Sequence, residues 1–453
     1  MKTLLIIGAG PGGYECAVRA AKAGLDVHIV DKVGHLGGTC LNEGCIPTKC
    51  LCHTAHIVQQ ARAAAAYGIQ ADCVSFDMQA ALERKNRILD QLRQGIQTLL
   101  KTPGITFHDG LARFLPGDPH TVIIGEETVV ADYVLIATGS VTKFLPIPGA
   151  HTPGVLTSEQ MLSLDHVPER LCVIGGGVIG LEFACIYQTL GSKVTVIEYS
   201  KEILPSFDAD IAKRLRTALK KQGVEIITDA PVTAIHADET QGGLLHISYE
   251  RRAAVHEALA DVALMAVGRQ AHVESLNLEE AGIGFTPRGI QVDEHYQTNV
   301  PGIYAVGDIN GLCQLAHAAT YQSFRALDHM LGNPLPATPS PIPAAVFTTP
   351  EAATVGLTEE QARQQCPDAL VRKGFYRING RALTMDAGND GFLKVVCTPE
   401  GKVLGAHVLG AQSAELIHEI ALLMNMGGTL GQLAATVHAH PTLSEVWLQV
   451  AEG

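Results

Sequence analysis

The sequence predicts an α/β fold in which one β-α-β unit occurs twice and an α+β region follows. The first copy is TLLIIGAGPGGYECAVRAAKAGLDVHIVD, residues 3–31, and the second is RLCVIGGGVIGLEFACIYQTLGSKVTVIE, residues 170–198. Each copy has an apolar run, a glycine turn, a helix-forming segment and a second apolar run that ends in an acid. Gly8 and Gly175 each precede that terminal acid by 23 residues. This order and this matched spacing predict two strand–helix–strand units with parallel strands.

The composition is that of a globular protein. The chain has 453 residues, of which 47% are hydrophobic and 17% charged, enough for about two to four domains. A formal charge of −13 disfavours nonspecific binding to nucleic acid. The apolar run at the start is too short for a signal peptide or a membrane span, so we expect a cytoplasmic protein. In that compartment, eleven cysteines do not indicate a disulfide scaffold.

The remaining elements follow in order. Apolar residues at helical spacing predict one long helix over about 76–101, and further helices are expected at about 208–222, from Ala316, and at about 413–426. The segment LGNPLPATPSPIPAAVF, rich in proline, marks the last domain boundary. We therefore expect four segments: 1–148 and 269–338 forming one domain, 149–268 forming a second, and 339–453 forming the α+β region.

The first glycine turn has the spacing of a dinucleotide-binding loop. Gly8 permits the tight turn, Gly10 lets the backbone approach a pyrophosphate, and Gly13 lets the helix pack on the strand. The N-terminus of that helix then offers N–H groups and a partial positive charge to the phosphates. Asp31, at the end of the second strand, can accept hydrogen bonds from ribose hydroxyls.

The second turn repeats this pattern with Gly175, Gly177 and Gly180, and Glu198 stands where Asp31 stands in the first. For either copy alone, a glycine-rich turn without a ligand is the alternative; the complete pattern, present twice, favours two Rossmann-like dinucleotide-binding domains. A carboxylate at 198 accepts from a 2′-hydroxyl and repels a 2′-phosphate. The second site is therefore expected to prefer NAD to NADP.

Two cysteines, Cys40 and Cys45, lie in the stretch GGTCLNEGCIPTK, residues 37–49. A structural zinc site needs a second ligand pair at a similar spacing, which the nearby Cys50 and Cys52 do not supply, so we expect no metal. Packing as small hydrophobes stays open. Five helical residues rise about 7.5 Å, beyond the Cα separation that a disulfide tolerates, so a bridge needs a distorted turn, which Gly44 permits. Pro47 suits the first turn of a following helix, whose N-terminus would stabilise a thiolate at Cys45; these features favour a redox disulfide.

This stretch resembles the active-site segment GGTC-x₄-C-x-P-[ST]-K of the pyridine nucleotide–disulfide oxidoreductases. The resemblance implies that Cys40 exchanges with substrate and that Cys45 lies against a flavin. It implies that Lys49 lies near the flavin and pairs with Glu182. It also implies FAD in the first nucleotide site, NAD in the second, and a C-terminal dimerisation domain.

Further segments match the family's cofactor-binding motifs in order along the chain. The resemblance assigns to FAD the residues Asp31, Lys49, Thr138, Gly139, Gly307, Asp308, Ala316 and His317, together with the first glycine loop. It assigns Gly268 to NAD, within AVGRQAH. In that motif Ala271 and His272 replace the family's usual Pro-Asn.

Near the C-terminus, VHAHPTLSE matches the family's H-P-T-x-x-E motif. Thiol–disulfide exchange needs a base, because the thiolate is the attacking species. By resemblance, His440 is that base, Glu445 orients it, and both reach the cysteines of a partner subunit in a homodimer. We also expect Pro441 to open a helix with His440 at its cap.

Within the family, the chain is similar to members that reoxidise the dihydrolipoyl groups of 2-oxoacid dehydrogenase or glycine cleavage complexes with NAD⁺. The expected partner is then a lipoyl-bearing acyltransferase or an H-protein-like carrier. A glutathione-type or other small-disulfide reductase is the alternative, although those that use NADP show arginines where this chain has YSKEILPSFD. The family's members with an extra C-terminal cysteine pair fit less well, because WLQVAEG has none. A third hypothesis is a flavoprotein that binds the cofactors but turns over no disulfide. The intact cysteine pair disfavours it.

Overall fold

A parallel sheet is built around the first glycine unit. The computed structural model describes every residue except 72, 337 and 453. The strand order is β20-β7-β1-β2-β3, and all pairings are parallel. Helix α1 (Pro11–Lys22) follows the glycine turn. The strands are β1 (Thr3–Ile7), β2 (Asp26–Asp31), β3 (Ile105–Asp109), β7 (Tyr133–Ile136) and β20 (Ile303–Ala305).

A second parallel sheet is built in the same way around the second unit, as the duplication predicted. Its order is β12-β11-β10-β16-β9. Helix α6 (Val178–Leu190) follows its glycine turn, and α7 (Ala209–Lys221) agrees with the helix expected near 208–222. The strands are β9 (Val155–Leu156), β10 (Arg170–Ile174), β11 (Lys193–Ile197), β12 (Glu225–Ile227) and β16 (Val262–Met265).

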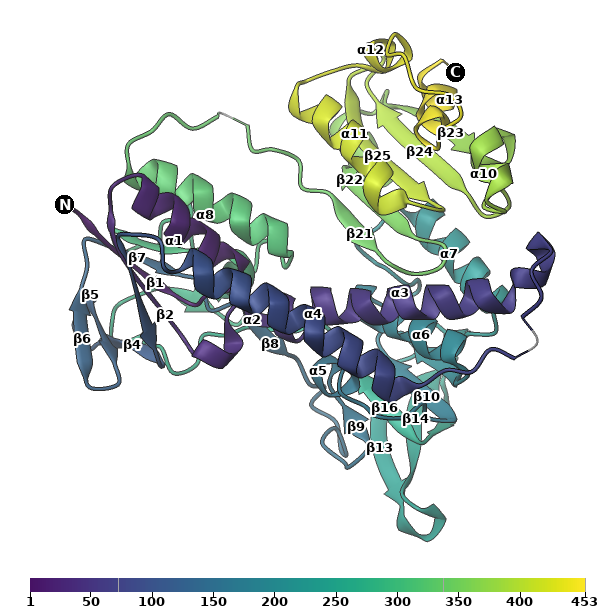
Figure 1. Cartoon of the computed structure of the whole chain (residues 1–453), viewed down its shortest axis with the longest axis horizontal. Coiled ribbons are helices and arrows are strands. Elements are labelled where there is room, and N and C mark those ends of the chain that lie inside the picture. Colours follow the sequence, from purple (N-terminus) through teal and green to yellow (C-terminus); the bar gives the residue numbers. More distant parts are fainter. Residues whose placement is uncertain (72, 337, 453) are drawn as a thin grey trace.

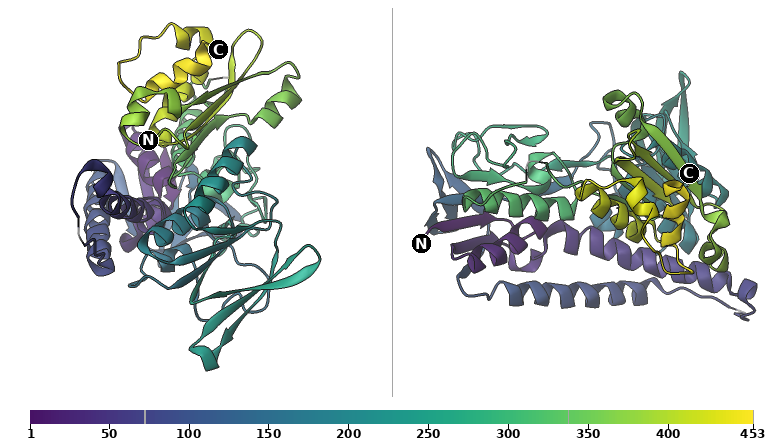
Figure 2. Two further views of the ribbon diagram at one scale, coloured as in Figure 1. Left: turned by 90° about the vertical axis from the view of Figure 1, so that its right-hand side faces the viewer. Right: turned by 90° about the horizontal axis from the view of Figure 1, so that it is seen from above.

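Two long helices join the two sheets. The helix α3 (Cys45–Arg62) starts at the second cysteine, and α4 (Met78–Leu99) confirms the long helix expected over 76–101. They lie side by side across the molecule (Figures 1 and 2). Helix α8 (Ala316–Met330) begins at the expected residue and packs on α1.

The C-terminal part is an antiparallel sheet covered by helices. Its order is β21-β22-β25-β24-β23, and α11 (Ser413–Asn425) lies on β22 and β25 (Figure 1). Trp447 is fully buried in its core. The strands are β21 (Ala344–Val346), β22 (Ala352–Gly356), β23 (Leu370–Phe375), β24 (Phe392–Cys397) and β25 (Val403–Leu409), and the other helices are α9 (Glu359–Gln365), α10 (Gly380–Thr384), α12 (Leu430–Ala434) and α13 (Leu448–Ala451).

Two antiparallel sheets of three strands accompany the parallel ones. One has the order β4-β5-β6, and the other has the order β13-β14-β15 and projects from the body (Figure 1). Their strands are β4 (Ala112–Leu115), β5 (Asp118–Ile124), β6 (Glu127–Val130), β13 (Val232–Asp238), β14 (Leu244–Arg251) and β15 (Ala254–Ala260). Outside positions 72, 337 and 453, no helix is long and apolar enough to cross a membrane.

Candidate active site

A large cavity of about 2450 Å³ connects the two parallel sheets with the thiol segment. It is more than twice the size of a pocket for a drug-sized ligand, so it has room for more than one such molecule. Every residue that the sequence assigned to a cofactor contributes to its wall, apart from Gly13 and Gly180, which lie behind the glycine turns. The thiol residues and the pair Lys49 and Glu182 line it as well.

The glycine turns have the geometry that a dinucleotide requires. Gly8 and Gly175 have φ angles of 107° and 111°, in the left-handed region that favours glycine. At Gly13 and Gly180, a Cβ would overlap the carbonyl oxygen of the first glycine of the same turn. Both copies therefore need glycine for the close packing of helix on strand.

The middle glycines of the two turns face open space. A Cβ at Gly177 would meet no atom within 4 Å, and one at Gly10 only the Cα of Gly38, at 3.9 Å. Both glycines line the cavity directly before the N-termini of α1 and α6. A pyrophosphate can therefore approach the backbone N–H groups of each helix without obstruction. The residues present fit FAD and NAD at these two sites.

The two acids, Asp31 and Glu198, accept hydrogen bonds from backbone N–H groups of the glycine turns. Asp31 Oδ2 accepts a hydrogen bond from the N–H of Ala9 at 2.7 Å, and Glu198 Oε2 accepts one from the N–H of Gly176 at 2.5 Å. Burial raises the pKa of Asp31. A carboxylate offers about four acceptor positions, so both acids keep lone pairs for ribose hydroxyls.

The thiols lie on either side of a break between two helices. Cys40 is in the short helix α2 (Gly38–Asn42), and Cys45 is the first residue of α3. Between them, Gly44 has φ −143° and ψ −104°, which interrupts the helix. The prediction that a distorted turn separates the two cysteines, with Cys45 at a helix N-terminus, is confirmed.

The two thiols differ in acidity. Their mutual hydrogen bond lowers the pKa of Cys45 and raises that of Cys40, and Lys49 favours the thiolate further. Both are free thiols here, and Cys45 is exposed to the cavity. Cys45, at the N-terminus of α3 and one turn before Lys49, is therefore the thiol whose thiolate form is favoured.

An ion pair between a partly exposed lysine and a buried carboxylate lies next to the thiols. Lys49 Nζ lies 2.7 Å from Glu182 Oε2, and Glu182 is only 3% exposed. Glu182 also accepts from the N–H of Phe347 at 3.0 Å, while Lys49 lies 4.6 Å from the centre of the Phe347 ring. The structure thus contains the Lys49–Glu182 pairing that the family resemblance implied. This ion pair joins α3 to α6.

The other motif residues line the cavity around the two glycine loops. Thr138 donates to the carbonyl of His272 at 3.1 Å, and Gly307 N–H donates to Gln322 at 2.8 Å. Burial raises the pKa of Asp308, whose carboxylate accepts from Ser140. Lining the cavity are Thr138, Gly139, Gly268, Gly307, Asp308, Ala316 and His317.

Sequence reasoning missed two groups in this wall. Arg269, next to the assigned Gly268, donates to the Ser140 carbonyl at 2.6 Å; the motif AVGRQAH was the available signal. Glu43, between the cysteines, pairs with His35 at 2.9 Å, which raises the pKa of His35 and lowers that of Glu43. No local sequence pattern connects Glu43 with His35.

The C-terminal histidine lies apart from the cavity of its own chain. His440 Nδ1 is 2.9 Å from Glu445 Oε1, and the imidazole is 80% exposed. Neither residue is among those that line the cavity, so one chain does not bring the histidine to the thiols. The expectation that Pro441 opens a helix is wrong: a 3₁₀ turn (Ser444–Trp447) begins three residues later. Glu445 accepts from the N–H of Thr442 at 2.7 Å, which is the bond that a glutamate in a first helical turn makes to the capping residue, so the helical start lies beyond Pro441.

A neighbouring histidine fastens this segment to the domain. His438 Nε2 lies 2.7 Å from Glu419 on α11, and its side chain is 5% exposed. His438 is thus an anchor for the loop, while His440 projects outward.

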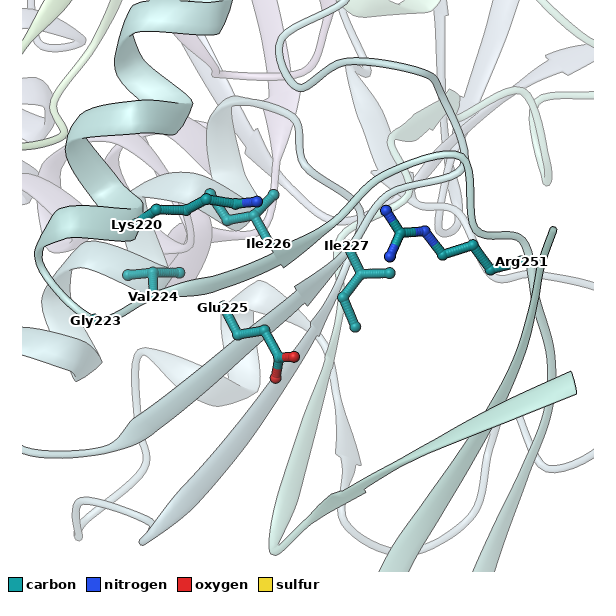
Figure 3. A pocket seen from close by; sticks show the side chains of 7 residues that line it. All are labelled: Lys220, Gly223, Val224, Glu225, Ile226, Ile227 and Arg251. Atoms are coloured by element: carbon teal, nitrogen blue, oxygen red, sulfur yellow. The ribbon is translucent and has the colours of Figure 1, made fainter. Parts of the chain in front are cut away.

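A second, smaller hollow of about 400 Å³ lies far from this chemistry, on the edge strand β12. Figure 3 shows Lys220 and Arg251 on either side of Ile226 and Ile227. It contains no thiol and none of the residues assigned from the sequence.

Comparison with known proteins agrees with the geometry. Residues 2–323 match the family model described as pyridine nucleotide-disulphide oxidoreductase, and residues 342–451 match the dimerisation domain of that family. Dihydrolipoyl dehydrogenase from Bacillus subtilis is 40% identical over 98% of this chain and 96% of its own. The enzyme of that name from Geobacillus stearothermophilus is 39% identical over 99% and 95%. The HOCl-induced flavoprotein disulfide reductase RclA from Escherichia coli superposes with a TM-score of 0.87 at 33% identity and covers 99% of both chains.

Proposed function

This chain belongs to the pyridine nucleotide-disulphide oxidoreductase family, and on that premise we propose that it reoxidises dihydrolipoyl groups with NAD⁺. The observation that carries the proposal is that Cys40 and Cys45 line the same cavity as both glycine loops. The relatives named dihydrolipoyl dehydrogenase support the choice of substrate. FAD in the first site, when bound, supplies the two-electron chemistry between the thiols and NAD.

The two cysteines have different tasks in this reaction. In the oxidised enzyme, a substrate thiolate attacks Cys40, the Cys40–Cys45 bond breaks, and Cys45 leaves as a thiolate. The second substrate thiolate then attacks the mixed disulfide, which releases the oxidised lipoyl ring and the Cys40 thiolate. The lowered pKa of Cys45 makes it the better leaving group. The cation of Lys49 stabilises the charge that Cys45 acquires.

The proton of the substrate thiol goes to His440 of a second copy of the chain. The support is geometric: His440 is exposed, is oriented by Glu445 through Nδ1, and stands apart from its own thiols. The match of residues 342–451 to a dimerisation domain supports a homodimer. The partner that presents the lipoyl group is an acyltransferase or an H-protein-like carrier.

We assign the segments accordingly. Residues 1–148 and 269–338 form the FAD domain, 149–268 the NAD domain, and 339–453 the dimerisation domain. The return of β20 to the first sheet, after the second sheet is complete, supports this division.

The assay uses purified protein with dihydrolipoamide and NAD⁺, followed through NADH formation. Activity with NADPH and glutathione disulfide but none with dihydrolipoamide would contradict the proposal. A disulfide reductase with another substrate is the second candidate, favoured by the likeness to the HOCl-induced flavoprotein disulfide reductase of Escherichia coli. Turnover of a panel of disulfides with NADH, without dihydrolipoamide oxidation, would select it.

Complementation tests the shared site. Cys45→Ser and His440→Gln homodimers are each expected to be inactive with dihydrolipoamide. A heterodimer with one chain of each kind, isolated through two different tags, contains one intact site if His440 serves the partner's thiols. It should regain about half of wild-type activity. A heterodimer as inactive as its parents would show that histidine and thiols act within one chain.

A further inference from the structure

A buried cluster of charges joins the second parallel sheet to the C-terminal sheet. Lys394 Nζ, on β24, lies 2.9 Å from Asp208, 3.1 Å from Asp210 and 2.6 Å from Glu359. The side chains of Lys394 and Asp208 are 3% and 2% exposed. The two aspartates stand at the start of α7, whereas Lys394 and Glu359 belong to the C-terminal part. The cluster therefore fixes one part of the protein against the other.

Asp208 is the centre of this cluster. Its Oδ1 accepts from the N–H of Asp210 at 3.0 Å, which caps α7, and its Oδ2 accepts from the N–H of Glu359 at 3.1 Å. His407 Nε2 on β25 lies 3.9 Å away and is fully buried. Every oxygen of the Asp208 carboxylate is thus engaged, mostly by groups of the C-terminal part.

The charges of the cluster balance. Lys373 lies 2.9 Å from Asp210, and Arg363 lies 3.1 Å from Glu359, so three cations face three carboxylates. His407 adds no charge at neutral pH, because burial lowers its pKa to about 4. Buried ion pairs contribute little net stability compared with apolar residues of similar size, and their attested use is to specify geometry.

The cluster lies at the end of a loop that forms part of the cavity wall. Residues 199–207 connect β11 to α7, and five of them line the cavity: Tyr199, Ser200, Pro205, Ser206 and Phe207. At its start this loop is held by Glu198, which accepts from the N–H of Ser200 at 2.6 Å. At its end it is held by Asp208. Glu198 fastens the loop to the glycine turn, and Lys394 fastens it to the C-terminal part.

We propose that Lys394 is a positioning residue for the nicotinamide dinucleotide: through Asp208 it holds the loop 199–207 in the conformation that binds the adenosine half. The inference rests on the assignment of NAD to the second glycine unit, within the proposed function. The dimerisation part of the chain then contributes to NAD affinity without touching the cofactor.

The test compares Lys394→Met with Lys373→Met in the FAD-loaded dimer. Lys373 pairs with Asp210 but is 47% exposed and makes no contact with Asp208, so it is the matched control. For K394M, we expect the dissociation constant of NAD⁺, measured by calorimetry, to rise about tenfold. Amide hydrogen exchange over 199–208 should rise as well. Both quantities should stay within about twofold of wild type in K373M.

Two half-reactions separate this inference from the proposed function. Flavin reduction by NADH should need about tenfold more NADH in K394M, whereas flavin reduction by dihydrolipoamide should be unchanged. Absence of the dihydrolipoamide reaction in wild type would refute the proposed substrate and leave the NADH comparison valid. A folded K394M dimer with wild-type NAD⁺ affinity and wild-type exchange would overturn the inference.

A milder variant covers the case in which K394M does not fold. In Asp208→Asn the side chain still caps α7, because asparagine is as good a cap as aspartate, but the charge that Lys394 and His407 face is lost. The dissociation constant of NAD⁺ should rise at least about threefold with FAD content unchanged. Unchanged NAD⁺ affinity in D208N would equally overturn the inference.

Discussion

Replacing Gly180 by alanine should damage the NAD site and leave FAD bound. The new Cβ would fall far inside the 3.0 Å below which such contacts do not occur, against the carbonyl oxygen of Gly175. Both sides of the clash are backbone, so α6 must move from the strand by roughly 1 Å. Overpacking of this kind costs about 1–3 kcal/mol, or a fall in Tm of about 2–12 °C for a domain of this size. A shift of about 1 Å in the N–H groups facing the pyrophosphate can weaken productive binding about 100-fold.

The assay measures NAD⁺ affinity by calorimetry, FAD content by absorbance and Tm by calorimetric scanning. Gly177→Ala is the matched control, since its Cβ meets no protein atom but projects into the cavity. G177A should lose NAD⁺ affinity with an unchanged Tm, whereas G180A should lose both. Gly13→Ala, the equivalent change in the first unit, should lower FAD content instead. A G180A protein with wild-type NAD⁺ affinity and Tm would refute the packing argument.

Three further predictions concern ionisable groups. Lys49→Met should raise the pKa of Cys45, so the pH profile of Cys45 alkylation in the reduced enzyme should move to higher pH; an unchanged profile would mean that Lys49 does not stabilise the thiolate. Glu445→Gln should lower turnover with dihydrolipoamide about 10²-fold, the smaller end of general base effects, and should leave flavin reduction by NADH unaffected; equal loss in both would point to misfolding. His407 has a pKa of about 4 when folded and a higher one when unfolded, so the unfolded state binds more protons between those values and stability should fall as pH drops from about 6.5 to about 4. His407→Gln should flatten this part of the curve in denaturant unfolding, and a wild-type slope in that variant would contradict the assignment.

The parts of the fold that were predictable depend on local pattern. The duplicated unit combines apolar runs, glycines and acids within about thirty residues, and each signal reports a backbone requirement that the structure satisfies. The left-handed φ of Gly8 and the approach of Gly13 to its carbonyl are examples. The long helix α4 could be predicted from the sequence because its apolar residues recur at helical spacing over its whole length.

The parts that were not predictable depend on contacts between distant segments. Lys394 and Asp208 are 186 residues apart, and nothing near either residue indicates the other. His35 and Glu43 are close in sequence, but their pairing depends on the turn between η1 (Val33–His35) and α2. At Pro441 the local preference gave the wrong start: Glu445 makes the backbone bond typical of a first helical turn to Thr442 and not to His440, and the helical turn starts only at Ser444.

In the proposed reaction, helix α6 connects the thiols with the nucleotide that receives the electrons. Its N-terminus, after Gly177, faces the place where the NAD phosphates would lie, and its second turn carries Glu182. Glu182 pairs with Lys49, one turn after Cys45 on α3. Because a helix moves as a rigid body over two turns, a displacement at its phosphate-binding end is transmitted to the ion pair beside the thiols. G180A should therefore disturb Lys49 and Cys45 as well as NAD⁺ binding, whereas G177A, which blocks the site without moving α6, should leave the alkylation profile of Cys45 unchanged.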